Sequence, residues 1–133
     1  MILAVTGGTG FVGGHLLRLA VEQGHRVRAL TRREQPAVAG VHWVAGDLGS
    51  PGDLCAGADA VIHIAGTINP PGRAGSVAGN VAGTASIVAA AQAACIKRFI
   101  HVSSLAAREP RLSDYGASKA TAEGLVLGSG LDT

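Results

Sequence analysis

The chain has 133 residues, about the length of one small domain, and 47% of them are hydrophobic, enough to build a core. Only 15% are charged and the formal net charge is +2, too small a basic excess to indicate binding to nucleic acid or a membrane surface. Cys55 and Cys95 show no metal-ligand or CxxC spacing, and no apolar run of about 20 residues is free of glycine and charge. We therefore expect a cytoplasmic protein with reduced thiols and with neither a nucleic-acid nor a membrane partner.

The chain begins with a strand, a glycine-rich turn and a helix. Residues 2–5 form an apolar run typical of a buried strand, and apolar residues spaced as one helix face follow over residues 11–23, before the capping residue Gly24. In the turn, Gly7 allows the tight bend, Gly10 lets a pyrophosphate approach the backbone, and Gly13 lets the helix pack close to the strand. Free N–H groups and the positive end of the helix dipole would face the phosphates.

Strands and helices alternate along the rest of the chain. Further strands are predicted over residues 26–30, 41–45, 59–64 and 97–103. Loops are predicted over residues 67–75, which include Pro70 and Pro71, and over residues 105–113. A short helix should open at Ser50 and Pro51, and longer helices should cover residues 76–94 and 115–127. Three glycines spaced four apart in the first of these long helices would form a bare stripe that another backbone could approach (Gly75, Gly79 and Gly83).

This alternation predicts a doubly wound parallel α/β sheet with right-handed crossovers and helices on both faces. A sixth strand should begin near Leu131. We therefore expect residues 1–133 to form one Rossmann domain that is truncated before the sixth strand and before any substrate domain.

Polar residues follow two of the strands where a dinucleotide would lie. Thr31 stands where an acidic residue would bind both ribose hydroxyls and select NAD, while Arg32 and Arg33 could clamp a 2′-phosphate and so favour NADP. The alternative is a pair of solvated surface arginines. Asp47 could accept a hydrogen bond from the adenine amino group with Leu48 against the ring, or could simply belong to an ordinary turn.

Tyr115 and Lys119 lie four residues apart and share one helix face. A lysine ammonium beside a phenol stabilises the phenolate, so this tyrosine could exchange a proton with a substrate oxygen, which a serine after the fifth strand could also hold. In isolation such a tyrosine and lysine are more often a surface pair. His63 and His101 fall in predicted buried strands, where a hydrogen-bonded structural role is the commoner one.

Five ordered segments together resemble the extended, epimerase/dehydratase-like branch of the short-chain dehydrogenase/reductase superfamily. Thr6-Gly7-Gly8-Thr9-Gly10-Phe11-Val12-Gly13 resembles its TGxxGxxG turn, and Gly46-Asp47-Leu48 its adenine-side Asp-Leu. His63-Ile64-Ala65-Gly66 and Asn80-Val81-Ala82-Gly83-Thr84 are similar to the segments at and after the fourth strand. Val102-Ser103-Ser104 and Tyr115-Gly116-Ala117-Ser118-Lys119 resemble the active-site serine segment and YxxxK.

The resemblance implies roles for these residues. Tyr115 would be the catalytic acid/base, Lys119 would assist it and bind the nicotinamide ribose, Ser104 (with Ser103 second) would hold the substrate oxygen, and Asn80 would support a helix kink and a proton-relay water. The implied cofactor-binding residues are Gly7, Gly10, Phe11, Val12, Gly13, Thr31, Arg32, Arg33, Asp47, Leu48, Ala65, Gly66, Tyr115 and Lys119. A homodimer through the helices around Asn80–Ala94 and Tyr115–Leu127 is also implied.

Three functions are consistent with these residues. The first is an NADP-dependent oxidoreductase (NAD being the alternative cofactor) that transfers a hydride to or from a small-molecule substrate while Tyr115 moves the proton. The second is a sugar-nucleotide epimerase or dehydratase that uses tightly held NAD transiently. The third is a non-catalytic dinucleotide sensor or assembly protein on the same fold. Intact Tyr115 and Lys119 disfavour the third, and only about ten residues separate Ser104 from Tyr115, which leaves little wall for a large sugar nucleotide.

Overall fold

The structure is a computed structural model that describes residues 1–68 and 72–133. In this part of the chain, strands and helices alternate much as predicted. The elements are β1 (Ile2–Thr6), α1 (Phe11–Glu22), β2 (Arg26–Thr31), β3 (Val41–Ala45), β4 (Ala60–His63), α2 (Gly72–Ser76), the π-helical segment η1 (Val77–Ala82), α3 (Gly83–Ala93), β5 (Arg98–His101), the short 3₁₀ helix η2 (Leu105–Arg108) and α4 (Asp114–Leu127).

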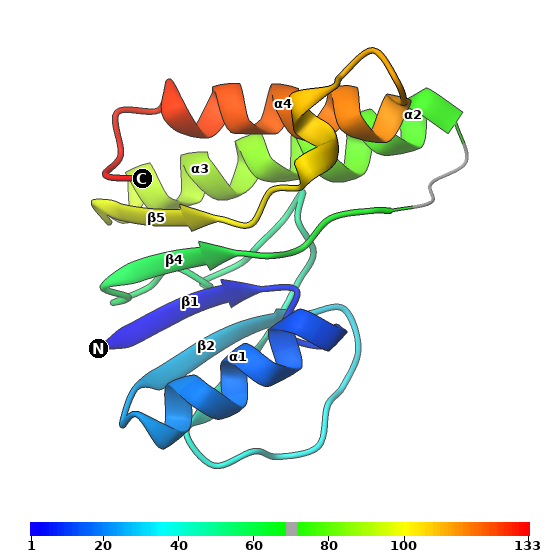
Figure 1. Cartoon of the computed structure of the whole chain (residues 1–133). Coiled ribbons are helices and arrows are strands. Elements are labelled where there is room, and N and C mark those ends of the chain that lie inside the picture. Colours follow the sequence, from blue (N-terminus) through cyan, green and yellow to red (C-terminus); the bar gives the residue numbers. More distant parts are fainter. Residues whose placement is uncertain (69–71) are drawn as a thin grey trace.

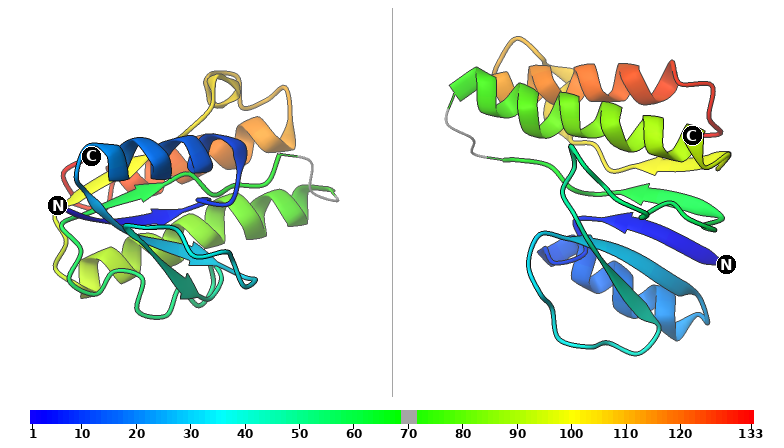
Figure 2. Two further views of the ribbon diagram at one scale, coloured as in Figure 1. Left: turned by 90° about the horizontal axis from the view of Figure 1, so that it is seen from below. Right: turned by 180° about the vertical axis from the view of Figure 1, so that it is seen from behind.

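All strand pairs of the sheet are parallel, in the order β3-β2-β1-β4-β5. The first strand is central: Val5 pairs with Ala29 of β2 on one side and with Ile62 of β4 on the other. Helix α1 covers one face, and α3 lies on the opposite face with α4 beside it (Figures 1 and 2). The predicted doubly wound α/β sheet is confirmed.

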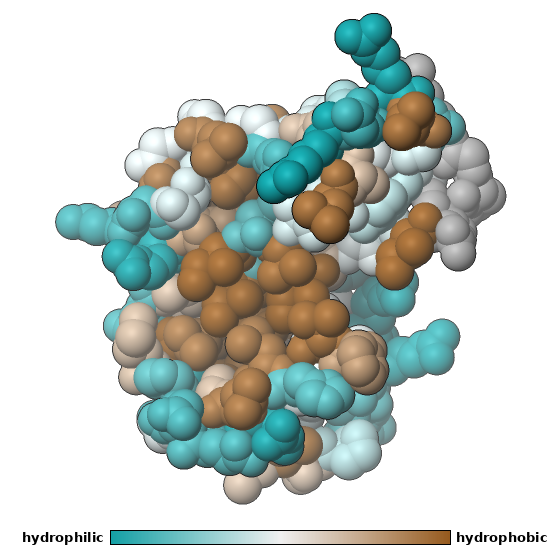
Figure 3. Space-filling view, viewed as in Figure 1, coloured by the Kyte–Doolittle hydropathy of each residue, from teal (hydrophilic) through white to brown (hydrophobic). Residues whose placement is uncertain are grey.

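Alternating side chains of the strands build a core on each face of the sheet. Leu3 and Val5 pack with Leu17 and Ala20 of α1. Helix α3 covers a second cluster that includes Val61, Ile87 and Phe99. Figure 3 shows an apolar area on the side of the sheet that faces the viewer, above α1. Ile100 of β5 is 48% exposed.

The glycine turn joins α1 tightly to β1. Gly7 has a φ of +76°, a left-handed conformation that side-chain-bearing residues rarely adopt. A Cβ on Gly13 would lie 1.9 Å from the carbonyl oxygen of Gly7, and a Cβ on Gly7 would lie 2.7 Å from the nitrogen of Ala65. The predicted roles of these two glycines, the tight bend and the close helix–strand packing, are therefore confirmed.

The short helix predicted at Ser50 and Pro51 is wrong. The structure has consecutive turns there, held by bonds between residues three apart, such as Leu54 N–H to the Pro51 carbonyl. Gly52, with a φ of +56°, takes a left-handed conformation that cannot continue an α-helix. Leu54 of this loop is buried in the core. The neighbouring Asp53 forms an ion pair with Arg28 at 2.7 Å.

The long helix begins earlier than predicted and is not uniform. Residues 72–75, predicted as the end of a loop, are helical, and Pro70 and Pro71 lie outside the described residues. The helix widens to π geometry over η1 before it returns to α geometry in α3. The glycine stripe receives side chains rather than a second backbone: a Cβ on Gly79 would meet Thr67 Oγ1, and one on Gly83 would meet Leu48 Cδ1.

Residues Ala74–Ala93 are long and apolar enough to cross a membrane, judged by length and composition alone. The core helix of a globular domain passes the same test. Ile87, Val88 and Ala91 of this helix are buried in the core beneath the sheet, as expected for the core helix of a globular domain.

The C-terminal residues return to the sheet. Part of the loop predicted over residues 105–113 is the short helix η2, because the Ser104 side chain accepts a hydrogen bond from the N–H of Ala106 and caps it. At the end of the chain, Asp132 forms a parallel bridge with Arg98 of β5, and its carbonyl accepts the Phe99 N–H at 2.9 Å. This bridge lies where the sequence predicts a sixth strand.

A buried histidine links both halves of the sheet to α3. His63 is 0% exposed, with Nδ1 2.6 Å from Thr6 Oγ1 and Nε2 3.0 Å from Thr84 Oγ1. Its ring stacks on that of His101 with centroids 5.4 Å apart. The hydrogen-bonded structural role predicted for His63 is confirmed, whereas both ring nitrogens of His101 are buried without a hydrogen-bond partner among the described residues.

The contact between Gly13 and Gly7 can be tested with a matched pair of substitutions. We expect Gly13→Ala to lower the free energy of unfolding by about 2 kcal/mol, because a Cβ forced against backbone costs more than the roughly 1 kcal/mol that alanine gains in a helix. Gly14→Ala is the control, because its Cβ would have 3.9 Å to the nearest atom. Urea unfolding measures both, and a Gly13→Ala variant as stable as Gly14→Ala would contradict the packing.

The burial of His63 predicts acid sensitivity. Burial, reinforced by the charges of His101 and Lys119, lowers the pKa of His63 from 6.5 to about 3. The unfolded chain takes up this proton near pH 6.5, whereas the folded chain does so only near pH 3. The contribution to stability is therefore complete above pH 6.5 and declines as the pH falls, by about 1.4 kcal/mol per pH unit.

Denaturant unfolding between about pH 7 and pH 5 checks this for the parent protein and for His63→Gln. The stability difference between the two should shrink as the pH falls, because only the parent has the buried imidazole. Parallel profiles would contradict the assignment of the acid sensitivity to His63.

Candidate functional site

Seven of the predicted site residues line a groove at the carboxyl ends of the central strands: Gly7, Thr31, Arg32, Asp47, Leu48, Ala65 and Gly66. The other nine do not line it: Gly10, Phe11, Val12, Gly13, Arg33, Asn80, Ser104, Tyr115 and Lys119. The groove has a volume of about 460 Å³. Its lining includes residues that follow β1, β2, β3 and β4 and residues of η1, and it comprises Gly7, Thr9, Leu30, Thr31, Arg32, Gly46, Asp47, Leu48, Gly49, Ala65, Gly66, Thr67, Ala78 and Gly79. The topology places these residues together because parallel strands end at the same edge of the sheet.

The N-terminus of α1 borders the groove through the glycine turn. Gly10 is the N-cap residue and has no side chain to satisfy the first N–H groups of the helix. The side chains of the next two residues, Phe11 and Val12, are 84% and 54% exposed. The turn thus offers backbone donors and a positive helix end without a side chain over Gly10, the arrangement that suits a phosphate.

The residues after β2 have two different environments. Thr31 is buried, and its hydroxyl donates to the Arg33 carbonyl at 2.6 Å, so it holds its own turn. Arg32 and Arg33 are exposed, and neither forms an ion pair within the described ranges. Both line a second cavity of about 640 Å³, which shares Thr31, Arg32, Gly46 and Asp47 with the groove.

Asp47 and Leu48 close the groove on the β3 side. One carboxylate oxygen of Asp47 accepts hydrogen bonds from the N–H groups of Gly49 and Ser50, at 2.8 and 2.9 Å. Asp47 therefore belongs to an ordinary turn, the alternative to adenine recognition in the sequence analysis. It is nevertheless exposed and lines the groove. Leu48 lies against Gly83 of α3, which leaves its side chain between the groove and the core.

Lys119 is buried at the other end of the groove. The residue is 4% exposed, and its ammonium donates to the Val102 carbonyl at 2.9 Å. A Cβ on Gly66 would lie 3.9 Å from Lys119 Nζ, so the lysine reaches the end of β4 from α4. Burial lowers the pKa of Lys119 from its usual 10.5, and the carboxylate of Glu123 partly opposes this shift.

Tyr115 is half-buried in the first turn of α4, one turn before Lys119. The helix begins there because Ser113 caps it, accepting the Gly116 N–H at 2.9 Å. Ser104 caps η2, whereas the neighbouring Ser103 Oγ is buried with no hydrogen-bond partner in the described part of the chain. The two serines predicted as alternatives therefore differ: Ser104 is engaged as an acceptor and Ser103 is free to bond.

Asn80 is buried within η1 and connects three segments. Its Oδ1 accepts the Thr67 N–H at 2.7 Å, and its Nδ2 donates to the Thr67 carbonyl and to Ser118 Oγ, both at 3.0 Å. Thr67 and Ser118 were not among the predicted site residues. Ser118 lies inside the Tyr115–Lys119 segment. Its role as a hydrogen-bond partner of Asn80, 38 residues away in sequence, appears only in the structure.

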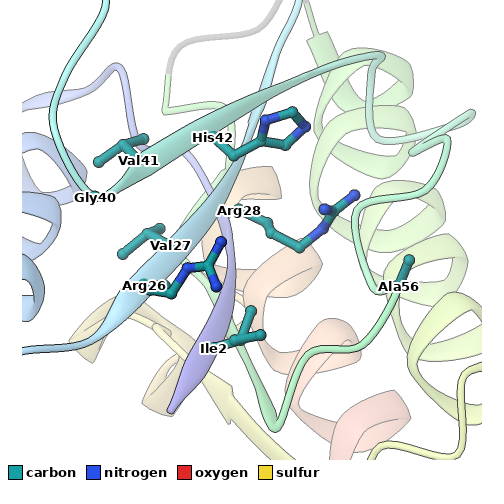
Figure 4. A pocket seen from close by; sticks show the side chains of 8 residues that line it. All are labelled: Ile2, Arg26, Val27, Arg28, Gly40, Val41, His42 and Ala56. Atoms are coloured by element: carbon teal, nitrogen blue, oxygen red, sulfur yellow. The ribbon is translucent and has the colours of Figure 1, made fainter.

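A different pocket lies at the amino ends of β1, β2 and β3. Figure 4 shows the basic side chains of Arg26, Arg28 and His42 on one side of it, in a cavity of about 430 Å³. None of the predicted site residues lines this pocket. The candidate site is therefore restricted to the carboxyl edge of the sheet.

Three comparisons relate the chain to known proteins. Ceramide reductase from Caulobacter vibrioides is 44% identical over 137 residues, which cover 94% of this chain and 41% of that protein. A crystal structure of a short-chain dehydrogenase/reductase superfamily protein from Agrobacterium tumefaciens with bound NAD is 28% identical, with a TM-score of 0.80 over 95% of this chain and 44% of that one. MoeE5 in complex with UDP-glucose and NAD is also 28% identical, with a TM-score of 0.82 over 96% of this chain and 48% of that one.

The chain thus spans less than half the length of these three relatives. The family model described as the NAD dependent epimerase/dehydratase family matches residues 3–130, which include the glycine turn, the strand ends around the groove, Tyr115 and Lys119. With this match over nearly its whole length, the chain belongs to the NAD-dependent epimerase/dehydratase family.

Proposed function

We propose that this chain forms the cofactor-binding part of an NADP-dependent reductase that interconverts a ketone and an alcohol. The observation on which the proposal depends is the position of Lys119: a buried ammonium beside Gly66 at the end of the groove, one helical turn from Tyr115. A protein that only bound a dinucleotide would not need this pair. The similarity to ceramide reductase supports a reductase in preference to an epimerase.

The absence of side chains at Gly7 and Gly13 supports binding of a nicotinamide dinucleotide, because its pyrophosphate must approach the backbone there. Gly7 and Gly13 leave room only for backbone, and the N-terminus of α1 supplies N–H donors. Arg32 and Arg33 would hold a 2′-phosphate, Asp47 and Leu48 would hold the adenine, and Ala65 and Gly66 would face the nicotinamide half. When bound, the dinucleotide supplies the hydride acceptor or donor.

Tyr115 would donate a proton to the carbonyl oxygen of the substrate or remove one from the alcohol. The Lys119 ammonium stabilises the phenolate that this transfer leaves, and it is held in place by the Val102 carbonyl. Ser104, or the unpaired hydroxyl of Ser103, would hold the same substrate oxygen. Asn80 keeps the loop at Thr67 against α4 and so maintains the end of the groove.

The second candidate is a sugar-nucleotide epimerase or dehydratase. It is favoured by the structural likeness to MoeE5, whose structure contains UDP-glucose and NAD. The two functions differ in their redox balance. A reductase consumes NADPH in proportion to product, whereas an epimerase or dehydratase regenerates its cofactor and shows no net change in nicotinamide absorbance.

Substitution of Arg32 tests the preference for NADP. We expect Arg32→Ala to weaken NADPH binding about tenfold to a hundredfold, because a charge-assisted bond to the 2′-phosphate is lost, and to leave NADH binding unchanged. Ligand fluorescence titration of the purified protein gives both dissociation constants. Arg26→Ala is the matched control, an exposed arginine at the opposite end of β2 (Figure 4). Equal losses for the two cofactors, or tighter NADH binding by the parent, would remove the arginine-clamp hypothesis.

Substitution of Tyr115 tests the proton transfer. We expect Tyr115→Phe to lower turnover at least a hundredfold with a panel of ketones, because the general acid is lost, while the dissociation constant of NADPH changes little. NADPH oxidation by the purified protein, followed by absorbance, measures the rate. Thr121→Ala, an exposed position on the same helix, is the control. Unchanged turnover in Tyr115→Phe would exclude the assigned role.

A further inference from the structure

A buried hydrogen-bond chain passes beneath the groove, and its first member is Thr6, the residue before the glycine turn. Thr6 Oγ1 accepts the N–H of Ala65 at 3.2 Å and contacts Nδ1 of His63 at 2.6 Å. Ala65 is also the residue against which Gly7 packs. One hydroxyl therefore joins the end of β1 to the loop after β4, on two sides of the groove.

A count of protons shows which group donates and which accepts in each of these hydrogen bonds. Thr84 Oγ1 donates its only proton to the Asn80 carbonyl at 2.6 Å, since a carbonyl can only accept. Its contact with Nε2 of His63 at 3.0 Å therefore requires that Nε2 bear a proton. In a neutral imidazole Nδ1 is then an acceptor, and Thr6 donates to it.

The surroundings of His63 favour the neutral imidazole. The residue is fully buried, its ring stacks on His101, and the Lys119 ammonium is close enough to oppose a second positive charge. Burial and these neighbours lower its pKa to about 3, so the ring is uncharged at neutral pH. The tautomer with the proton on Nε2 is thus the form that satisfies both neighbouring threonines.

At its other end this series of hydrogen bonds reaches α4, the helix that contains Tyr115. The backbone of Asn80 accepts from Thr84, and its side chain binds Thr67 and donates to Ser118 Oγ. Ser118 Oγ in turn donates to the carbonyl of Tyr115 at 2.8 Å. Each bond is buried or partly buried, where hydrogen bonds are strong and an unpaired partner is costly.

We propose that His63, in the neutral tautomer protonated on Nε2, is a positioning residue that couples the phosphate-facing turn to the Asn80–Tyr115 end of the groove. It acts through Thr6 and Ala65 on one side and through Thr84 and Asn80 on the other. Loss of either bond of the imidazole shifts both ends, although His63 itself lines no part of the groove. The proposal rests on the proposed function for the identity of the cofactor.

The test uses a pair of variants at Thr84 that separates the hydroxyl from packing. Thr84→Val keeps the shape but removes the hydroxyl, and Thr84→Ser keeps the hydroxyl but removes the methyl group. We expect Thr84→Val to weaken ADP-ribose binding about tenfold, the effect of one lost buried hydrogen bond, and Thr84→Ser to bind within about twofold of the parent. Isothermal titration calorimetry of the purified protein, well below its unfolding temperature, gives the constants.

ADP-ribose is the probe because it lacks nicotinamide and a 2′-phosphate, so its affinity depends on neither the chemistry of Tyr115 nor the Arg32 clamp. His101→Phe is the matched control: it keeps the ring stack and belongs to no hydrogen bond of the chain. It should bind ADP-ribose as the parent does. A purely structural role predicts one of two results. Either the variants are less stable but bind ADP-ribose with unchanged affinity, or Thr84→Ser binds ADP-ribose as weakly as Thr84→Val does. Each of these results overturns the proposal.

Nitrogen-15 NMR of the histidine rings provides a second, independent readout. At neutral pH we expect the His63 ring to show a protonated Nε2 and an unprotonated Nδ1. A ring protonated on Nδ1, or on both nitrogens, overturns the proposal even if the binding results agree with it. Failure of the parent to bind any adenine dinucleotide overturns the proposed function and the coupling together, whereas parent-like binding by all variants overturns only the coupling.

Discussion

The close approach of α1 to β1 is the constraint on which the rest of the structure depends. With the carbonyl of Gly7 only 1.9 Å from where a Cβ of Gly13 would lie, the two elements meet backbone to backbone. This contact holds the N-terminus of α1 at the carboxyl end of the central strand, beside the loop at Ala65. The groove exists because the turn occupies so little volume at the point where the neighbouring strands also end.

The face of the sheet beneath α3 and α4 contains several buried polar side chains. Thr6, His63, Thr84 and Asn80 are all nearly fully buried, yet each side chain is hydrogen-bonded. Such groups stabilise a fold only when every partner is present, so they fix the relative positions of the elements more strictly than apolar contacts do. This polar layer lies between the glycine turn and the helix of Tyr115.

The residues near the two ends of the groove have different environments. At one end the Thr31 hydroxyl is bonded within its own turn, and the neighbouring Arg32 and Arg33 are exposed. At the other end Lys119 is buried and fixed by a carbonyl. A relative named ceramide reductase and a relative whose structure contains UDP-glucose and NAD both share this part of the molecule.

The sequence by itself determined the alternation of strands and helices along the chain, the glycine turn and the residues that end each strand, because these depend on local periodicity and on glycine spacing. It could not determine that Gly52 adopts a left-handed turn in place of a helix, or that Thr67 and Ser118 bind Asn80 from 13 and 38 residues away. Only the tertiary structure decided these, since hydrogen-bond partners distant in sequence are chosen by strand register and helix packing. The same applies to His63, whose isolated position in a buried strand indicated a structural role but not the two threonines that define its tautomer.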